Sequence, residues 1–435
     1  MKKTGTVIFA LCCLLLCLGL SLGTLIFGPA GAGANERLAP LPKLTAKGEL
    51  NGEYLSQLSA WFGDHFWLRQ DCISLRNRLA SLTGASPVKD VVLGKEGWLY
   101  YAPTLTDYTA SEPMTEGELS ACARNLALMA EYCEEKGTAF LFVPVPNKNT
   151  LYPEHMPTYP AADTHDAQRL LGLLDTVPHV DLFTLFRSQG ETLYYAHDSH
   201  WTQRGAALGA DAILTALGRD SNYFADSFPA RARHDGDLYE MLYPAWMDLE
   251  HGPVYGGGFT YVREGTDTKP DSITINTTSG GEGTLLCYRD SFGNDLYPYL
   301  AEVFAAARFS RSTAYDLTPE AEAVVIELVE RNLRYLLTYA PKMPAPRRDL
   351  TVPAASLPET DLVLGKPGQL KGCRQLTGRL DSPAERVYLV CPGGVYEACL
   401  LEGGFSAWLP EGEVPETVLV QREGTLYAAP ANAVE

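Results

Sequence analysis

The sequence predicts an α/β protein with a mostly parallel sheet that is flanked by helices, followed by a small C-terminal all-β module. Three observations lead to this fold class. Short apolar runs such as 139–143 alternate with amphipathic segments, which is the pattern of a parallel sheet covered on both faces. The apolar fraction of 46% in 435 residues is enough for a sizeable core. Beyond residue 353, short apolar runs are separated by turns rich in Gly, Pro and Glu.

The first element is an uncharged apolar run at about 7–27, preceded by Lys2 and Lys3. A helix of roughly twenty apolar residues spans a bilayer core of ~30 Å. Lysines on its amino side place the rest of the chain outside the cytoplasm. A cleaved signal peptide is the alternative, because small residues stand at 31–34. We favour an uncleaved single-pass anchor, since the run is longer than the ~7–15 apolar residues of most signal peptides.

The chain divides into four predicted segments. They are a transmembrane signal-anchor or signal peptide (1–28), a linker and N-terminal helical region (29–85), the α/β domain (86–341) and the β-rich module (354–435). Apolar residues at helical spacing predict helix over 54–82 in the second segment. The Pro-rich stretch 341–353 marks the boundary before the last segment.

Within the α/β domain, each element follows from a local pattern. Thr115 and Glu118 form a capping box that begins a helix, and Gly137 ends it. A Gly-Lys-Glu-Gly turn at 94–97 predicts a hairpin after the strand at 91–93. The remaining predicted strands are 139–143, 179–182, 284–288 and 324–328. The remaining predicted helices are 166–174, 203–217, a segment running through residue 300, and 331–337.

Charge and cysteine usage exclude some classes of function. The net charge of −18 comes without a sustained basic stripe, which argues against a nucleic-acid binder. No Cys-x-x-Cys pair occurs among the ten cysteines, so neither a zinc site nor a disulfide framework is indicated. One bridge among Cys373, Cys391 and Cys399 remains open at this stage.

Two segments contain the residue types of a serine hydrolase. Asp198 and His200 lie two apart, so that in an extended or turn segment both side chains point to one side. A carboxylate fixes the tautomer of the catalytic imidazole and stabilises the imidazolium. Ser291 follows the apolar strand at 284–288 and precedes a helix. Amides at such a helix start can stabilise an oxyanion.

Spacing alone does not decide between catalysis and a structural role. Asp-x-His arises often by chance, and Ser291 has the residue type of an ordinary helix N-cap. His200 is equally compatible with a hydrogen-bonded structural histidine or a metal ligand. We do not favour a metal, because no His-x-x-x-His pattern accompanies Asp198.

Several motifs together resemble one family. The Asp-Ser-His-Trp-Thr segment at 198–202 is similar to the D-x-H-W signature of the SGNH-hydrolase-like alginate O-acetylation proteins (AlgX and AlgJ type) and of the related DHHW family. Arg-Asp-Ser-Phe-Gly at 289–293 resembles the nucleophile block of that family. Other family-like stretches stand in the same order, at 64–66 with Arg69, 94–100, 145–148 with 152–153, and 329–333. The resemblance covers roughly residues 36–340.

The resemblance implies a permuted SGNH-hydrolase-like fold, in which the Asp-x-His segment precedes the serine. It assigns Ser291 as the nucleophile, His200 as general base and acid, and Asp198 as the residue that orients His200. The first candidate oxyanion donor is the backbone N–H of Ser291 or Phe292, and Asn147 or Lys148 is the second oxyanion or substrate-binding candidate. Neither a metal nor another cofactor is expected.

The function that these expectations favour is an extracytoplasmic O-acetyltransferase acting on a cell-surface or exported polysaccharide. The resemblance also implies a membrane-bound O-acyltransferase partner that supplies the acetyl group. Two alternatives stay open: a carbohydrate esterase, and a non-catalytic glycan-binding or assembly protein on the same fold. Transferase and esterase differ only in whether a sugar or water reaches the acyl-enzyme.

Overall fold

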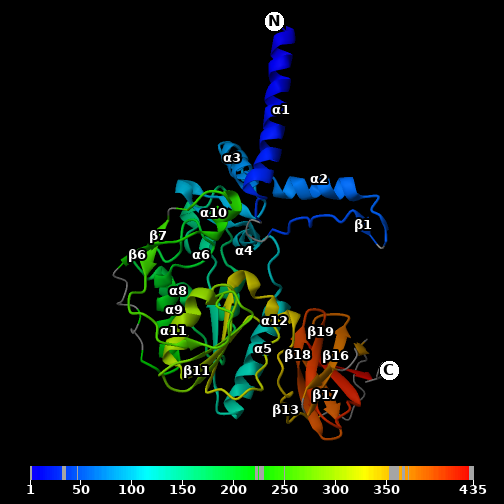
Figure 1. Cartoon of the computed structure of the whole chain (residues 1–435). Helices are drawn as coiled ribbons and strands as arrows, with labels where there is room; N and C mark the ends of the chain where they lie inside the picture. Colours follow the sequence, from blue (N-terminus) through cyan, green and yellow to red (C-terminus); the bar gives the residue numbers. More distant parts are fainter. Residues whose placement is uncertain are drawn as a thin grey trace.

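The computed structural model describes residues 2–31, 36–46, 48–220, 224, 230–248, 250–351, 362–364, 368–370 and 372–430. An N-terminal helix projects away from a layered α/β body, and an all-β module lies against one side of that body (Figure 1). Helix α5 (Glu116–Glu135) lies between the central sheet and this module. The predicted architecture, a mostly parallel sheet flanked by helices and followed by a small C-terminal all-β module, is confirmed.

The projecting helix α1 spans Lys2–Phe27. Its segment Gly5–Phe27 is long and apolar enough to cross a membrane, and a signal sequence meets the same criterion. Of the small residues expected at a peptidase site, 32–34 lie outside the described residues. The choice between an uncleaved anchor and a cleaved signal peptide therefore stays a prediction.

The N-terminal helical region contains two helices instead of one continuous helix. Helix α2 covers Tyr54–His65 and helix α3 covers Arg69–Ser81. Between them Phe66 is extended and Leu68 has a left-handed backbone with φ 64°. A right-handed helix cannot pass through a left-handed residue, so the apolar spacing over 54–82 overstated its continuity. Strands β1 (Thr45–Ala46) and β2 (Glu49–Leu50) form a small hairpin before them.

The central sheet has six strands in the order β5-β12-β10-β11-β9-β8. The first four are parallel, and the last two are antiparallel additions at one edge. Their bounds are β5 (Ala139–Val145), β12 (Ala323–Val329), β10 (Thr284–Tyr288), β11 (Ala306–Ser310), β9 (Thr274–Thr278) and β8 (Val262–Arg263). The strand predicted at 179–182 is wrong. Only His179 bridges to Phe142, and helix α8 begins at Leu182.

Helices cover both faces of this sheet because its strands are apolar on both sides. Phe140 and Phe142 pack with α5, α7 (Asp166–Leu171) and α12 (Tyr335–Thr338). Leu141 and Val143 point to the opposite face, toward α8 (Leu182–Arg187), α9 (Gln203–Ala216) and α11 (Gly293–Val303). The expected capping box of α5 is present, and Gly137 follows that helix with φ 70°.

Short elements surround the carboxyl end of the sheet. The predicted hairpin pairs β3 (Val91–Leu93) with β4 (Leu99–Tyr101), and β6 (Ala230–Arg233) pairs with β7 (His251–Val254). The remaining short helices are η1 (Lys95–Gly97), η2 (Ala102–Thr104), α4 (Leu105–Thr109), α6 (Lys148–Leu151), η3 (Pro153–His155), α10 (Asp237–Leu242) and η4 (Glu330–Asn332).

The C-terminal module is an antiparallel sheet in the order β14-β16-β19-β18-β17-β20-β21, with β13 on β18 and β15 on β16. Its strands are β13 (Arg347–Arg348), β14 (Leu362–Leu364), β15 (Gly368–Leu370), β16 (Cys373–Leu380), β17 (Arg386–Cys391), β18 (Gly394–Leu401), β19 (Gly404–Pro410), β20 (Thr417–Arg422) and β21 (Thr425–Pro430). Cys373, Cys391 and Cys399 are free thiols. Parts of the predicted segment 354–435, including 354–361 and 431–435, lie outside the described residues.

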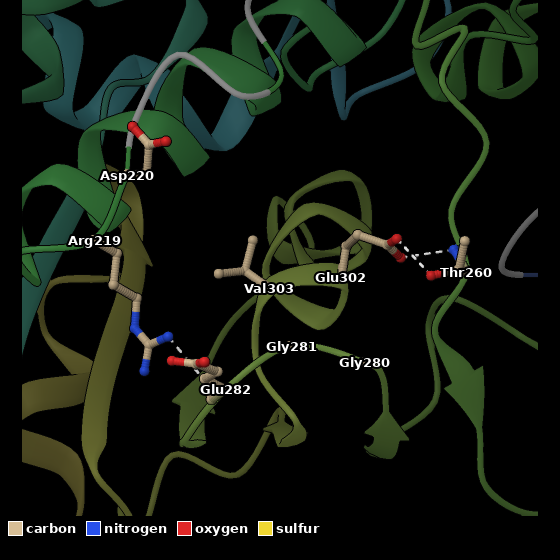
Figure 2. Close-up of a pocket in the computed structure, with 8 residues that line it drawn as sticks. All are labelled: Arg219, Asp220, Thr260, Gly280, Gly281, Glu282, Glu302 and Val303. Carbon is tan, nitrogen blue, oxygen red and sulfur yellow. Dashed lines mark hydrogen bonds between the residues drawn. The ribbon is translucent and has the colours of Figure 1, made fainter.

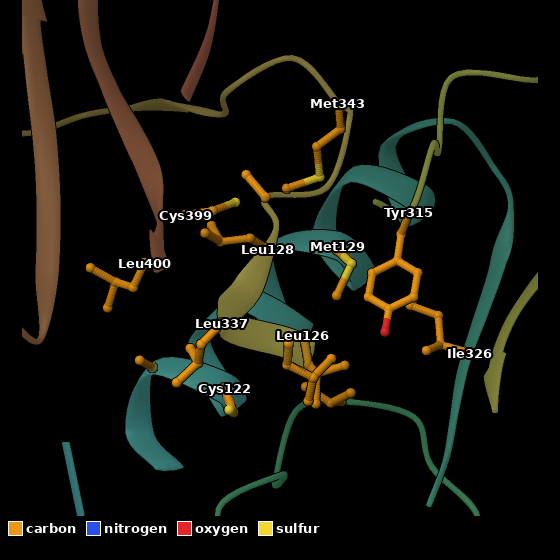
Figure 3. Packing of buried hydrophobic residues seen from close by; sticks show 14 of the residues in the cluster. Cys122, Leu126, Leu128, Met129, Tyr315, Ile326, Leu337, Met343, Cys399 and Leu400 are labelled. Atoms are coloured by element: carbon orange, nitrogen blue, oxygen red, sulfur yellow. The ribbon is translucent and has the colours of Figure 1, made fainter. Parts of the chain in front are cut away.

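The module shares a hydrophobic core with the α/β domain. Cys399 and Leu400 of β18 lie beside Leu128 and Leu337 (Figure 3). The fully buried amide of Asn125 donates to the carbonyl oxygens of Leu336 (3.0 Å) and Leu400 (2.7 Å) and accepts from Leu400 N–H at 2.9 Å. Apolar packing and hydrogen bonds together attach the module to α5.

Candidate active site

The Asp-x-His segment forms a tight loop directly before helix α9. Tyr194 and Trp201 pair across it, and the Thr202 hydroxyl accepts from Gly205 N–H to cap the helix. Trp201 is fully buried, and its indole Nε1–H donates to the carbonyl oxygen of Phe292 at 3.1 Å. This bond ties the loop to the turn that carries Ser291.

Ser291 lies in the short turn between the carboxyl end of β10 and the first residue of α11. The carboxylate of Asp290 braces this turn. It accepts from the backbone N–H groups of Phe292 (2.9 Å) and Val329 (2.8 Å) and from Nδ2–H of Asn332 (2.9 Å). The serine is therefore held between β10 and β12, at the end of the sheet where α/β proteins bind their ligands.

The structure brings Ser291, His200 and Asp198 together. His200 Nε2 lies 2.8 Å from Ser291 Oγ, and His200 Nδ1 lies 2.7 Å from Asp198 Oδ1. Because the carboxylate only accepts, this geometry assigns the ring proton to Nδ1 and leaves Nε2 to accept the serine proton. These are the relations that a serine nucleophile, a general base and an orienting carboxylate require.

Asp198 is buried and accepts four hydrogen bonds. Oδ1 receives His200 N–H as well as Nδ1–H, and Oδ2 receives His234 Nε2–H at 2.9 Å and Asp237 N–H at 3.0 Å. Burial works to raise the pKa of Asp198, but the hydrogen bonds from His200 and His234 hold that pKa well below its usual range. Asp198 is thus a carboxylate at neutral pH.

Both histidines respond to this carboxylate. Burial works to lower the pKa of His200, yet the hydrogen bond and the charge of Asp198 raise it above the ordinary value. The pKa of His234 is raised for the same reason, and its ring stacks on Tyr195 with centroids 3.7 Å apart. Sequence reasoning missed His234, because it lies 34 residues beyond His200 with no recognisable motif around it.

Asp237 supports the loop from a second side. Its carboxylate accepts from Ser199 N–H at 2.7 Å and from the Ser199 hydroxyl at 2.5 Å. The distance from Asp237 Oδ2 to His200 Nδ1 is 3.6 Å, beyond a normal hydrogen bond. Asp237 therefore holds the position of Ser199, whereas Asp198 binds the imidazole directly.

Of the predicted oxyanion candidates, Phe292, Asn147 and Lys148 have their donors engaged elsewhere. Phe292 N–H donates to Asp290, and Asn147 donates through its backbone to Glu330 (3.0 Å) and through its side chain to Asp107 (2.8 Å). Lys148 is buried, and Nζ donates to the carbonyl oxygens of residues 99, 196 and 198 at 2.5, 2.7 and 2.8 Å. Among the described residues, the serine turn retains two backbone N–H groups without an acceptor, those of Ser291 and Gly293.

Burial lowers the pKa of the Lys148 ammonium to about 7, with the nearby carboxylate of Asp198 acting in the opposite direction. The ammonium has three protons, and each is donated to one carbonyl oxygen. These hydrogen bonds act with the charge of Asp198, against burial, to favour the charged form of Lys148. Because one of these carbonyls belongs to Asp198, Lys148 holds the backbone of the Asp-x-His loop in position.

Two groups of side chains have the composition of a metal site. The ligand atoms of His197, Asp248 and Glu250 lie within 4.8 Å of one another, as do those of Asp198, His200 and Asp237. In the first group, Glu250 accepts from the backbone N–H groups of residues 196 and 197, and Asp248 binds His197 Nδ1 at 2.8 Å. These bonds brace the segment before the Asp-x-His loop.

Cavities occur at both ends of the central sheet. One of about 660 Å³ lies near Gly281 and Val303, at the amino end of β10 and away from Ser291 (Figure 2). There the Glu302 carboxylate accepts hydrogen bonds from the backbone N–H and the hydroxyl of Thr260, and the Arg219 guanidinium donates to Glu322. A second cavity, of about 390 Å³, adjoins Ser291 at the carboxyl end of the sheet. Of these two cavities, the second meets the predicted site.

Comparison with known proteins identifies the α/β part. The family model described as "SGNH hydrolase-like domain, acetyltransferase AlgX" matches residues 91–269, a segment that contains Asp198 and His200 and ends before Ser291. A curated relative, "Probable alginate O-acetylase AlgJ" of Pseudomonas syringae pv. tomato, is 26% identical over 210 residues. The match covers 44% of this chain and 51% of the relative, so the chain spans about half the length of the curated relative that it matches.

Solved structures with similar folds have low sequence identity to this chain. PatB1 of Bacillus cereus is 18% identical with a TM-score of 0.43, covering 56% of this chain and 96% of its own. A DHHW family protein of Eubacterium siraeum is 15% identical with a TM-score of 0.41, covering 57% and 95%. The matched segment and the curated relative confirm the predicted resemblance of this chain to the SGNH-hydrolase-like AlgX and AlgJ proteins.

Proposed function

We propose that this protein is an extracytoplasmic O-acetyltransferase that acts on a polysaccharide through an acyl-enzyme at Ser291. The observation that carries the proposal is the geometry of one imidazole. His200 lies 2.8 Å from Ser291 Oγ through Nε2 and 2.7 Å from the Asp198 carboxylate through Nδ1. A serine hydroxyl becomes a nucleophile when a neighbouring base of this kind removes its proton.

The chemistry then follows in two steps. His200 takes the proton of Ser291 Oγ while Oγ attacks the carbonyl carbon of the acyl donor, and the protonated imidazole returns that proton to the departing group. A sugar hydroxyl next attacks the ester, its proton passes to His200, and the bond between the acyl carbon and Oγ breaks as Oγ regains a proton. Asp198 stabilises the imidazolium in both steps.

The oxyanion that forms in each step needs hydrogen-bond donors. The backbone N–H groups of Ser291 and Gly293 are the donors that we assign, because they stand at the start of α11 without an acceptor among the described residues. A helix start also contributes a partial positive charge. For Phe292, Asn147 and Lys148 we propose a supporting role, since their donors hold the turn and the loop in place.

The cellular setting remains part of the proposal. The apolar helix α1 supports a membrane anchor or an exported chain, which would bring the site to the outer face of the membrane. The relative named as an alginate O-acetylase supports a polysaccharide acceptor. An acyl donor formed inside the cell would then need a membrane-bound O-acyltransferase to carry the acetyl group across.

A fluorophosphonate probe and p-nitrophenyl acetate test the proposal. We expect the wild type to be labelled and to release a burst of p-nitrophenol, and both signals to be lost in Ser291→Ala and His200→Ala. Ser188→Ala is the matched control, because Ser188 is exposed at the end of α8 and does not line the cavity beside Ser291. Labelling that persists in Ser291→Ala would refute the nucleophile. An unlabelled, folded wild type would favour the non-catalytic glycan-binding alternative.

The esterase alternative uses the same three residues and differs in the fate of the acyl group. Incubation with p-nitrophenyl acetate and an oligosaccharide separates the two activities. Acetylated sugar detected by mass spectrometry indicates transfer, whereas release of acetate alone, with an acyl-enzyme on Ser291, indicates hydrolysis.

A further inference from the structure

The cavity of about 390 Å³ beside Ser291 is built from the carboxyl ends of three neighbouring parallel strands. Ser291 follows β10, Arg311 follows β11, and Asn332 follows β12. Tyr335 and Tyr339, from α12 and the residue after it, also line the cavity. The nucleophile and two tyrosines therefore line the same cavity. We call this space the serine cavity.

The serine cavity is much larger than the acyl group requires. An acetyl group has three heavy atoms, and at the ~30 Å³ that a water molecule occupies in the liquid it fills roughly 100 Å³. A cavity of about 390 Å³ lies within the range of ~300–1,000 Å³ that is usual for small-molecule sites. Most of the space is thus available to the molecule that receives or delivers the acyl group.

The two tyrosines are unusually accessible for aromatic side chains. Tyr335 is 41% exposed and Tyr339 is 52% exposed, although buried apolar side chains such as Leu336 and Leu337 stand between them in the chain. The face of an aromatic ring carries partial negative charge, and it attracts the weakly positive C–H groups of a sugar ring. Two exposed tyrosines that line the cavity of the nucleophile therefore favour a sugar as its ligand.

The floor of the serine cavity is polar. Glu327 Oε1, Tyr315 Oη and Arg289 Nε are buried atoms without a hydrogen-bond partner in the described part of the chain, and all three residues line the cavity. Burial raises the pKa of the Glu327 carboxyl well above its usual range. Unpaired buried polar groups cost free energy, which hydroxyl-bearing ligands can recover.

We infer that the serine cavity binds the acceptor sugar ring, which packs against Tyr335 and Tyr339 while one of its hydroxyls faces Ser291. The inference rests on the proposed function and adds the binding site of the acceptor sugar and the two residues that hold it. In the transfer step, the oxygen of that hydroxyl forms a new bond to the acyl carbon and its proton passes to His200. The Ser291 ester bond breaks, and Oγ takes the proton back.

Saturation-transfer NMR tests binding separately from catalysis. The probes are deacetylated alginate oligosaccharides, which are anionic, and cello-oligosaccharides, which are neutral. We expect transfer to the ring protons of at least one probe with the wild type and with Ser291→Ala, because binding does not need the nucleophile. In the double variant Tyr335→Ala/Tyr339→Ala we expect the affinity to fall at least about tenfold. The variant Tyr335→Phe/Tyr339→Phe keeps both ring faces and should keep most of the affinity.

The matched control is Tyr159→Ala, because Tyr159 is 42% exposed and does not line the serine cavity. Circular dichroism verifies that each variant is folded. Unchanged affinity in the double alanine variant would overturn the inference. It would also be overturned if neither probe binds to the wild type. The p-nitrophenol burst is measured on the same samples, so a failure of the proposed acyl-enzyme is seen independently of a failure to bind sugar.

Discussion

Asp198→Asn is the substitution that most directly tests the proposed triad. The carboxylate accepts from four N–H groups, two on each oxygen. An amide has the same shape but only one accepting oxygen, so in either orientation its NH₂ group faces two of these donors. If the oxygen stays toward His200, the contacts to His234 and Asp237 are lost. If the amide flips, His200 loses its partner and must change tautomer.

The size of the effect follows from the lost interaction. A hydrogen bond to a charged group contributes about 1.5–3 kcal/mol, which corresponds to roughly 10- to 150-fold in rate. The wrong tautomer raises the loss further, and the same substitution in a well-studied serine protease triad costs about ten-thousandfold. We therefore expect kcat/KM for p-nitrophenyl acetate to fall by about a thousandfold. Asp237→Asn is the matched control and should cost far less, because Asp237 lies 3.6 Å from the imidazole.

The pH dependence gives a second, independent sign. General base catalysis needs neutral His200, and Asp198 raises the pKa of His200 above its ordinary value. Activity of the wild type should therefore rise with pH through a midpoint above the ordinary ~6.5 of histidine. In Asp198→Asn the midpoint should move to lower pH, with a lower plateau. Rates measured between about pH 5 and 9 show both effects. A variant within about fivefold of wild type, with an unshifted midpoint, would refute the assignment of Asp198.

Three further predictions concern the groups that hold the site and the module. Asn125→Ala leaves the buried backbone of Leu400 without these partners and should lower the free energy of unfolding by about 2–3 kcal/mol in a urea titration, whereas Asn276→Ala, at an exposed position of β9, should have little effect. Burial raises the pKa of Glu330 from 4.5 to about 7, so the folded state binds a proton that the unfolded state releases. The free energy of unfolding should fall, by at most about 3 kcal/mol, as pH rises from about 4.5 to 7, and Glu330→Gln should flatten this slope. Lys148→Met removes the donor to three carbonyls and should lower both the melting temperature and the rate of fluorophosphonate labelling, and an unchanged labelling rate would contradict its positioning role.

Local sequence patterns predicted the elements with strong periodicity or an apolar run. The capping box at Thr115, the strands at 139–143 and 284–288 and the helix beginning at Gln203 all appear in the structure. The errors have a common origin. The segment 179–182 was read as a strand from its apolar character, but Asp181 caps a helix there instead. Strand β9 was missed because its sequence, Thr-Ile-Asn-Thr-Thr, has little apolar content.

What the sequence by itself determined is the set of chemical groups and their order. Asp198 and His200 belong to one loop, and a serine follows an apolar strand, because these relations span a few residues and depend on local conformation. The tertiary structure decided which serine His200 meets, since Ser291 is 91 residues away and reaches it only through the packing of β10 and α9 in one core. It also decided that His234 binds Asp198, that the donors of Phe292, Asn147 and Lys148 are engaged elsewhere, and that two exposed tyrosines line a cavity beside the serine. Each of these depends on how distant segments pack, which no local pattern of residues records.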